Sequence, residues 1–199
     1  MSIRKLRITA LRLSLLPVVA VAVFVRPSWG LESTTAFLLE FAGYLVLLAG
    51  LAIRIWCIFY IGGRKSQQIV TQGPYSICRN PLYVGTFLLA IGAGLCFENL
   101  IMLALCAPIV LITHFLVVRM EEAHLEASFG EEYRRYKRRV PRYWPRLRNY
   151  ESPETVPVSV RAIRRIAMDT AGVLLLPEIE DMLEILHHSG VVPVLWYFP

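Results

Sequence analysis

Two stretches of the chain carry residue types that could bind a charged ligand. The first reads Gly-Pro-Tyr-x-x-x-Arg-Asn-Pro-x-Tyr-x-Gly over residues 73–85. Gly-Pro and Asn-Pro favour turns, and Pro81 suits the first position of a helix, so we expect a folded loop. Its Tyr75 and Tyr83 rings could stabilise a cation, and its Arg79 could hold a carboxylate. Taken singly, these three side chains also fit an aromatic belt and a membrane anchor.

The second stretch starts with two adjacent acids, Glu121 and Glu122. It continues as Phe-Gly-Glu-Glu-Tyr-x-x-Tyr-x-x-x-Val-Pro-Arg over residues 129–142. Glu121 shares a helix face with the apolar residues four and eight positions later, and Gly130 offers a stop for that helix. Carboxylates stabilise cations. On spacing alone, a solvated helix face explains the paired acids equally well.

Tyr133 and Tyr136 follow this stop and lie three residues apart among five basic residues. A helix that presents tyrosines and cations together is typical of a segment lying on anionic lipid. We therefore expect both tyrosines at the lipid interface.

Four apolar runs flank these two stretches. A helix of about 20 apolar residues crosses the roughly 30 Å hydrocarbon core of a bilayer. Only Glu98 and Asn99 separate the third run from the fourth, which predicts a tight antiparallel hairpin. The expected transmembrane helices cover residues 8–25, 36–61, 82–97 and 100–118.

The composition supports an integral membrane protein. Of 199 residues, 56% are hydrophobic and 18% are charged, and the mean hydropathy is +0.52. Soluble domains have fewer apolar and more charged residues, at about 45–50% and about 25%. A disordered chain, a disulfide-stapled secreted module and a nucleic-acid partner are therefore excluded. The four cysteines have no metal-ligand spacing and are expected to be small buried residues, with no metal site.

The cations orient the predicted spans. All Lys and Arg except Arg26 and Arg54, 19 of 21, lie in the N-terminal flank, the 62–81 loop and the tail. By the positive-inside rule these segments are cytoplasmic, which predicts a multi-pass protein of the inner or plasma membrane with both termini in the cytoplasm. A cleaved signal peptide is the alternative for the N-terminus, since a basic start precedes an apolar run and Ala20-Val21-Ala22.

The last fifty residues differ in composition. Residues 149–160 contain prolines and no periodic apolar pattern, which predicts a linker. A basic amphipathic pattern follows over 159–176 and an acidic one over 177–188. We expect two interfacial helices and a membrane-inserted apolar end, with a fifth membrane span as the alternative. We expect His187-His188 to mark the end of a helix rather than a metal site. The predicted domains are N-terminal transmembrane helices (1–61), the loop, hairpin and post-hairpin helix (62–148), and the linker with the membrane-associated end (149–199).

Together the two stretches resemble the isoprenylcysteine carboxyl methyltransferase family and its bacterial relatives, which are integral membrane enzymes that use S-adenosylmethionine. The likeness rests on Arg-Asn-Pro-Leu-Tyr-Val-Gly, the paired acids and the Phe-Gly-Glu-Glu-Tyr block, and covers roughly residues 60–145. It implies an all-α membrane fold with a cofactor pocket on the cytoplasmic face. Asn80 stands where eukaryotic members have His, and Val117 where they have an Arg for the prenylcysteine carboxylate.

The resemblance also implies the site. Arg79 and Glu121 would be the catalytic residues, and S-adenosylmethionine the cofactor. The implied cofactor-binding residues are Gln67, Gln68, Ile69, Val70, Tyr75, Arg79, Asn80, Pro81, Leu82, Tyr83, Glu121 and Glu122.

We expect a methyltransferase whose acceptor is an amphiphilic lipid or lipidated molecule from the bilayer, such as an isoprenylcysteine-like carboxylate. A carboxylate acceptor needs no base, whereas an amine must lose a proton, which would give Glu122, His124 or His114 a role. The alternatives are a phospholipid N-methyltransferase, an NADPH-dependent membrane reductase of related architecture, and a non-catalytic membrane scaffold.

Overall fold

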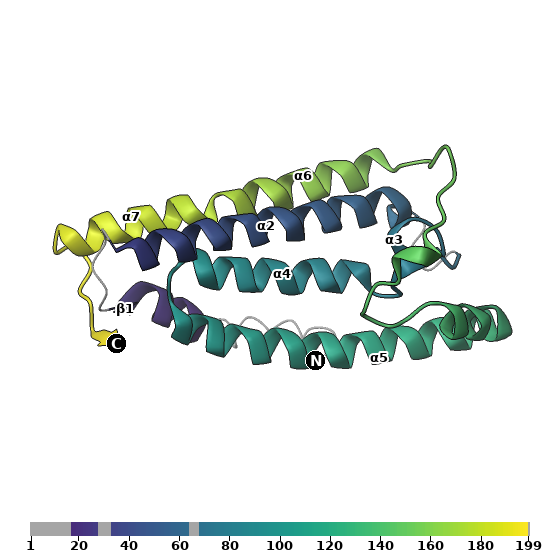
Figure 1. Cartoon of the computed structure of the whole chain (residues 1–199), viewed down its shortest axis with the longest axis horizontal. Coiled ribbons are helices and arrows are strands. Elements are labelled where there is room, and N and C mark those ends of the chain that lie inside the picture. Colours follow the sequence, from purple (N-terminus) through teal and green to yellow (C-terminus); the bar gives the residue numbers. More distant parts are fainter. Residues whose placement is uncertain (1–16, 28–32, 64–67, 199) are drawn as a thin grey trace, which may run out of the picture. The chain divides into compact units, whose positions relative to one another are not determined.

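The computed structural model is mostly helical and describes residues 17–27, 33–63 and 68–198 (Figure 1). Most of the first predicted span, the signal-peptide alternative and Gln67 lie outside the described residues. Of that span, residues 17–24 are helical, and a short strand begins at Val25.

The elements follow the apolar runs closely. They are β1 (Val25–Pro27), α2 (Thr34–Ile61), α3 (Pro74–Ile77), α4 (Pro81–Cys96), α5 (Leu100–Arg139), η1 (Leu147–Asn149), α6 (Val160–Leu174), α7 (Leu176–His188) and β2 (Trp196–Phe198). Pro81 begins α4, as the sequence predicts.

Two of the described helices, α2 and α5, are long and apolar enough to cross a membrane. The apolar helix α4 has 16 residues and is shorter than a typical span. The second, third and fourth predicted spans are thus confirmed as helices, while four crossings and their orientation stay a prediction. Within α5, Gly130 adopts φ 53° and ψ −122°, so the helix is broken where the sequence predicts a stop.

The chain divides into two compact units. Unit 1 is drawn from Met1–Leu47, Ala90–Val110 and Leu174–Pro199, and unit 2 from Leu48–Leu89 and Leu111–Val173. The predicted boundaries after residues 61 and 148 are not tested by this division and stay a prediction.

Unit 1 contains the predicted hairpin. Asn99 fills the turn between α4 and α5: its side-chain oxygen accepts a hydrogen bond from the Met102 amide at 2.9 Å, and its amide nitrogen donates to the Val25 carbonyl at 2.8 Å. Buried Val18, Ala22, Phe97 and Met102 form the core beside this turn. The antiparallel hairpin is therefore fixed by a polar cap as well as by its apolar faces.

The end of the chain also lies in unit 1. Trp196–Phe198 pairs in parallel with Val25–Pro27, and the Leu195 amide donates to the Phe24 carbonyl at 2.9 Å. The sequence analysis expected a membrane-inserted end here. In the structure, strand pairing satisfies the backbone of this end, which an apolar composition alone does not reveal, and membrane insertion of the end stays a prediction.

In unit 2, α2 and α4 cross at Gly50 and Gly85. A Cβ on Gly50 would lie 2.9 Å from the Gly85 carbonyl oxygen, and one on Gly85 would lie 3.0 Å from that of Gly50. Any larger residue would separate the two helices. This close crossing brings the loop that precedes α4 beside the end of α2.

Helix α6 packs along the same part of α2 (Figure 1). A Cβ on Gly62 would lie 2.8 Å from that of Ala162, and Arg54 pairs with Asp169 at 3.6 Å while donating to Thr86 at 2.7 Å. The sequence analysis assigned this helix to the membrane surface. The structure places it against α2, where Asp169 supplies a counter-charge for the lone arginine of that apolar helix, and its position relative to a membrane stays a prediction.

Candidate functional site

The loop before α4 is folded, as its turn residues predict. Gly73 has φ 59°, and a Cβ there would lie 2.4 Å from the Tyr60 ring, so only glycine fits. Pro74 then starts the single turn α3, and the Ser76 hydroxyl donates to the Gly73 carbonyl at 2.7 Å. The turn buries Tyr75 and Ile77, and Asn80 just after it donates to Glu122 of α5 at 3.3 Å.

Residues 141–152, which we call the strap, run along this loop. The strap is hydrogen-bonded to successive loop residues, and this continuity is the main structural feature that the sequence analysis missed. Its contacts are Arg79 N to Pro141 O (2.9 Å), Asn80 Nδ2 to Arg142 O (3.2 Å), Arg146 N to Ile77 O (3.0 Å), Glu151 N to Ser76 Oγ (3.0 Å) and Gly73 N to Glu151 O (2.7 Å).

Cys78 lies between the loop and the strap. Its thiol donates to the carbonyls of Arg142 and Tyr143, at 3.4 and 3.3 Å. Burial raises the pKa of this thiol to about 11, so it is a protonated structural donor at neutral pH. The predicted role of a small buried residue is confirmed for Cys78.

A pocket of unit 2 gathers most of the predicted site. Pro81 is not among its lining residues, and Gln67 is not described. Ten of the twelve predicted residues line it: Gln68, Ile69, Val70, Tyr75, Arg79, Asn80, Leu82, Tyr83, Glu121 and Glu122.

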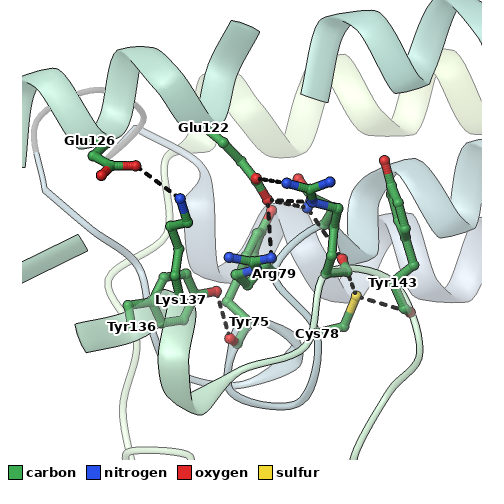
Figure 2. A network of polar contacts seen from close by, with 10 residues as sticks. Tyr75, Cys78, Arg79, Glu122, Glu126, Tyr136, Lys137 and Tyr143 are labelled. Carbon is green, nitrogen blue, oxygen red and sulfur yellow. Dashed lines mark hydrogen bonds and ion pairs between the residues drawn. The ribbon is translucent and has the colours of Figure 1, made fainter. Parts of the chain in front are cut away.

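Five further residues line the pocket: Ile61, His124, Leu125, Tyr133 and Tyr136. The expectation that Tyr133 and Tyr136 face lipid is wrong, because their exposed fractions are only 2% and 7%. Tyr136 donates its hydroxyl to the Tyr75 carbonyl at 2.8 Å (Figure 2). The two tyrosines lie on the helix face that packs against the loop, and their i, i+3 spacing indicated a shared face without showing what it covers.

Glu122 lies at the centre of a polar network (Figure 2). Arg142 donates to both carboxylate oxygens, from Nη2 at 2.6 Å and from Nε at 3.2 Å. Asn80 donates to the same carboxylate at 3.3 Å, and Arg79 pairs with it at 3.6 Å. With these partners Glu122 holds the loop to α5, and it is poorly suited to accept a proton from a substrate.

Two buried polar atoms of the pocket have no hydrogen-bond partner among the described residues. They are Nε of Arg79, whose side chain is 10% exposed, and the hydroxyl of Tyr75, which lies beside the weakly hydrogen-bonding thiol of Cys57. Burial raises the pKa of Tyr75, so this hydroxyl stays protonated. Buried polar atoms are normally satisfied, and orphaned ones in a pocket are available to a ligand.

Glu121 has a different environment from its neighbour. It accepts a hydrogen bond from the Tyr83 hydroxyl at 2.7 Å, and the Tyr83 ring packs edge-on against His114 at 5.1 Å between ring centroids. His114 is not among the lining residues of the pocket, whereas His124 is both lining and exposed. Of the three candidate proton acceptors, His124 is therefore the one in a suitable position.

Unit 1 contains the one group of three acids among the described residues that could hold a metal ion, namely Glu180, Asp181 and Glu184. Arg26 is bonded to Glu180 and pairs with Glu184 at 3.7 Å, so a cation already neutralises part of this charge. Nε2 of His187 contacts the Val23 carbonyl at 2.7 Å.

The pocket of unit 2 is thus suited to a small molecule that carries both charges. Tyrosine rings and the Glu121 carboxylate favour a cationic group, and Arg79 favours an anionic one.

The comparisons with known proteins agree with this chemistry. The phospholipid methyltransferase family matches residues 33–132. The chain is 37% identical over 139 residues to the cobalt-zinc-cadmium resistance protein CzcN of Cupriavidus metallidurans, covering 70% of this chain and 64% of CzcN. It is 35% identical over 146 residues to the nickel-cobalt-cadmium resistance protein NccN of Alcaligenes xylosoxydans xylosoxydans, covering 73% and 68%.

The chain is also similar to protein-S-isoprenylcysteine O-methyltransferases. The rat enzyme, from Rattus norvegicus, is 33% identical over 121 residues, which are 52% of this chain and 40% of that enzyme. The chain therefore spans about two thirds of the two resistance proteins and two fifths of the rat enzyme.

Proposed function

This chain belongs to the phospholipid methyltransferase family, and we propose from that premise that it transfers a methyl group from S-adenosylmethionine to a lipid or lipidated acceptor in the membrane. The observation that carries the proposal is the pocket, which gathers ten of the twelve residues implied for the cofactor.

The described residues fit this cofactor. S-adenosylmethionine supplies a methyl group on a positive sulfonium and also carries a carboxylate. The rings of Tyr75, Tyr133 and Tyr136 line the pocket and can stabilise a cation, at about 0.5–2 kcal/mol for each ring contact. The unpartnered Nε of Arg79 can donate to a carboxylate, and the unpartnered Tyr75 hydroxyl can donate or accept.

Positioning is what this chain would contribute to the reaction. An acceptor held in line with the transferred group can lower the barrier by about 7–11 kcal/mol. Glu121 and Tyr83 form one fixed side of the pocket through their 2.7 Å hydrogen bond. Buried side chains around them exclude water, which strengthens the electrostatic interactions inside.

We infer an acceptor that does not depend on Glu122 as a base, and a carboxylate or another anionic group meets this condition. Glu122 is occupied by three neighbouring side chains, so it does not supply a base. This chain has Val117 at the position where eukaryotic members have an arginine for the prenylcysteine carboxylate, so an acceptor carboxylate would lack that partner. Arg119, two residues on, has its guanidinium over the Phe115 ring at 4.2 Å. The acceptor therefore need not be a prenylcysteine. An amine acceptor would require His124 as the base.

The names of CzcN and NccN assign those proteins to metal resistance. A methyltransferase that modifies a membrane component is compatible with a role in metal resistance. The names of these two relatives do not identify any residue of the site. We therefore keep methyl transfer as the proposed activity for this chain.

Calorimetry in detergent tests the proposal. The purified chain should bind S-adenosylhomocysteine and not NADPH. Tyr75→Phe removes the unpartnered hydroxyl, and Glu121→Gln removes the carboxylate charge; each should weaken binding about threefold to tenfold, the range expected for one polar contact. Tyr60→Phe is the matched control, because its hydroxyl bonds Ser152 at 2.7 Å outside the pocket lining.

The outcomes separate the candidate functions. Binding of NADPH alone would support the reductase, and no binding of either ligand would support the scaffold. Incubation with radiolabelled cofactor and a native lipid extract then identifies the acceptor by the fraction that becomes labelled. Wild-type affinity in both Tyr75→Phe and Glu121→Gln would refute the site assignment.

A further inference from the structure

Arg142 is the last residue of the motif that begins Phe-Gly-Glu-Glu-Tyr and lies beyond residue 132, where the match to the family ends, yet its side chain reaches the centre of the site. Its guanidinium bonds both oxygens of the Glu122 carboxylate, at 2.6 and 3.2 Å. This fork-to-fork geometry is the most directional contact that an arginine can make with a carboxylate. The Glu122 side chain is only 6% exposed, so its orientation depends on these fixed donors.

Glu122 passes this constraint on to the pocket (Figure 2). Its Oε1 atom pairs with Nη2 of Arg79 at 3.6 Å and accepts from Asn80 at 3.3 Å. Arg79 therefore has one nitrogen engaged by Glu122, while its buried Nε has no partner among the described residues. Because the guanidinium is planar and the side chain is buried, the contact at Nη2 restricts the direction of the remaining donors.

The main chain of Arg142 acts on the same loop as its side chain. Its carbonyl accepts hydrogen bonds from Asn80 at 3.2 Å and from the Cys78 thiol at 3.4 Å. The preceding residue, Pro141, accepts from the Arg79 amide at 2.9 Å. Three consecutive loop residues are thus bonded to two consecutive strap residues, and Arg142 connects this ladder to α5 through Glu122.

We propose that Arg142 is a positioning residue of the pocket: it fixes Glu122, and Glu122 in turn fixes Arg79 in the direction that meets the carboxylate of a bound ligand. The ligand part of this proposal rests on the proposed function. It reassigns Glu122, which the sequence analysis placed among the cofactor contacts, to the support of Arg79.

Double-mutant cycles on the full chain in detergent test this role. Arg142→Gln and Glu122→Gln should each weaken S-adenosylhomocysteine binding about tenfold, as expected for losing the orientation of a charge-assisted hydrogen bond. Arg142→Gln should cause no further loss in an Arg79→Gln background, because Arg142 acts through Arg79. Arg142→Lys should be intermediate, since an ammonium cannot bond both oxygens in a fixed plane.

A second measurement does not depend on the ligand. Alkylation of Cys78 by N-ethylmaleimide, located by peptide mass mapping, reports whether the strap stays on the loop, because the thiol is buried against Arg142 and Tyr143. The rate should rise about tenfold or more in Arg142→Gln and Glu122→Gln. Arg146→Gln is the matched control: it removes the same charge from an exposed strap side chain and should label like wild type.

The outcomes distinguish this proposal from the proposed function. Multiplicative losses in the Arg142→Gln/Arg79→Gln double variant would overturn the proposal, as would a Cys78 rate in Arg142→Gln equal to that of Arg146→Gln. Absence of S-adenosylhomocysteine binding by wild type would refute the cofactor assignment; the Cys78 rates would then decide whether Arg142 fixes the loop.

Discussion

Among the described residues, each unit buries one glutamate, and the two side chains have different surroundings. Glu122 in unit 2 and Glu180 in unit 1 are similarly inaccessible, with side chains that are 6% and 9% exposed. Glu122 is bonded by Arg142, Asn80 and Arg79. Glu180 is bonded by the single cation Arg26.

Neighbouring acids increase the difference between Glu180 and Glu122. Burial, and secondarily the neighbouring acids Glu184 and Glu98, raise the pKa of Glu180 to about 6, and Arg26 offsets only part of this. The comparison teaches that burial alone does not decide how much a carboxylate contributes to the stability of the fold. The number and direction of its donors decide it: Glu122 joins three segments of the chain, whereas Glu180 is a charge that its surroundings compensate incompletely.

Glu122→Gln should give the largest effect on stability. Removing one partner of a buried ion pair leaves the other charge uncompensated, so we expect a loss of about 3 kcal/mol in the free energy of unfolding. Unfolding in mixed micelles, followed by tryptophan fluorescence, measures it. Glu126→Gln is the control on the same helix, because Glu126 makes its ion pairs with Arg134 and Lys137 toward solvent. Equal losses in both variants would contradict the central role of Glu122.

Glu180→Gln should act in the opposite direction, and by less. The raised pKa means that protonated Glu180 contributes stability below about pH 4.5, and this contribution is lost as the pH rises through about 6. Glutamine mimics the protonated form, so the variant should match wild type near pH 4.5 and exceed it by about 1–2 kcal/mol at pH 7.5. Paired thermal melts across this range measure the difference. A variant less stable than wild type at pH 7.5 would show that the Arg26 contact outweighs burial.

Glu184→Gln should give the smallest effect. Glu184 raises the pKa of Glu180 and also competes for Arg26 at 3.7 Å, so its removal should lower the pKa of Glu180. The midpoint of the pH-dependent stability should then move down by a fraction of a pH unit. The same melts, referenced to the Glu180→Gln/Glu184→Gln double variant, detect this shift. An unchanged midpoint would show that Glu184 does not contribute to the raised pKa of Glu180.

Much of the site was predictable because its residues lie in short local patterns. Gly73-Pro74 and Asn80-Pro81 specify turns through their own backbone preferences, and the structure has a glycine at φ 59° and helices starting at both prolines. Gly130 broke its helix as expected for the same reason. These backbone preferences of glycine and proline do not depend on contacts with distant parts of the chain.

The roles of Tyr133, Tyr136 and Arg142 were not predictable in the same way. All three belong to the motif that suggested the family, yet an amphipathic pattern shows only that one face of a helix is covered. Whether lipid or protein covers it depends on a partner more than fifty residues away: Tyr136 bonds the Tyr75 carbonyl. The pairing of the strap with the loop was not predictable, because the strap contacts the loop through its main-chain atoms, which are the same for every sequence.

The sequence by itself determined the helices, the hairpin, the turns of the loop and membership of a methyltransferase family, since each depends on composition or on residues close together. Only the tertiary structure decided which of two adjacent acids supports the loop and which faces Tyr83, that Arg142 completes the network, and that α6 packs on α2 through Arg54 and Asp169. These outcomes depend on which donors from distant parts of the chain pack against each buried carboxylate. The spacing of residues along the sequence does not determine this.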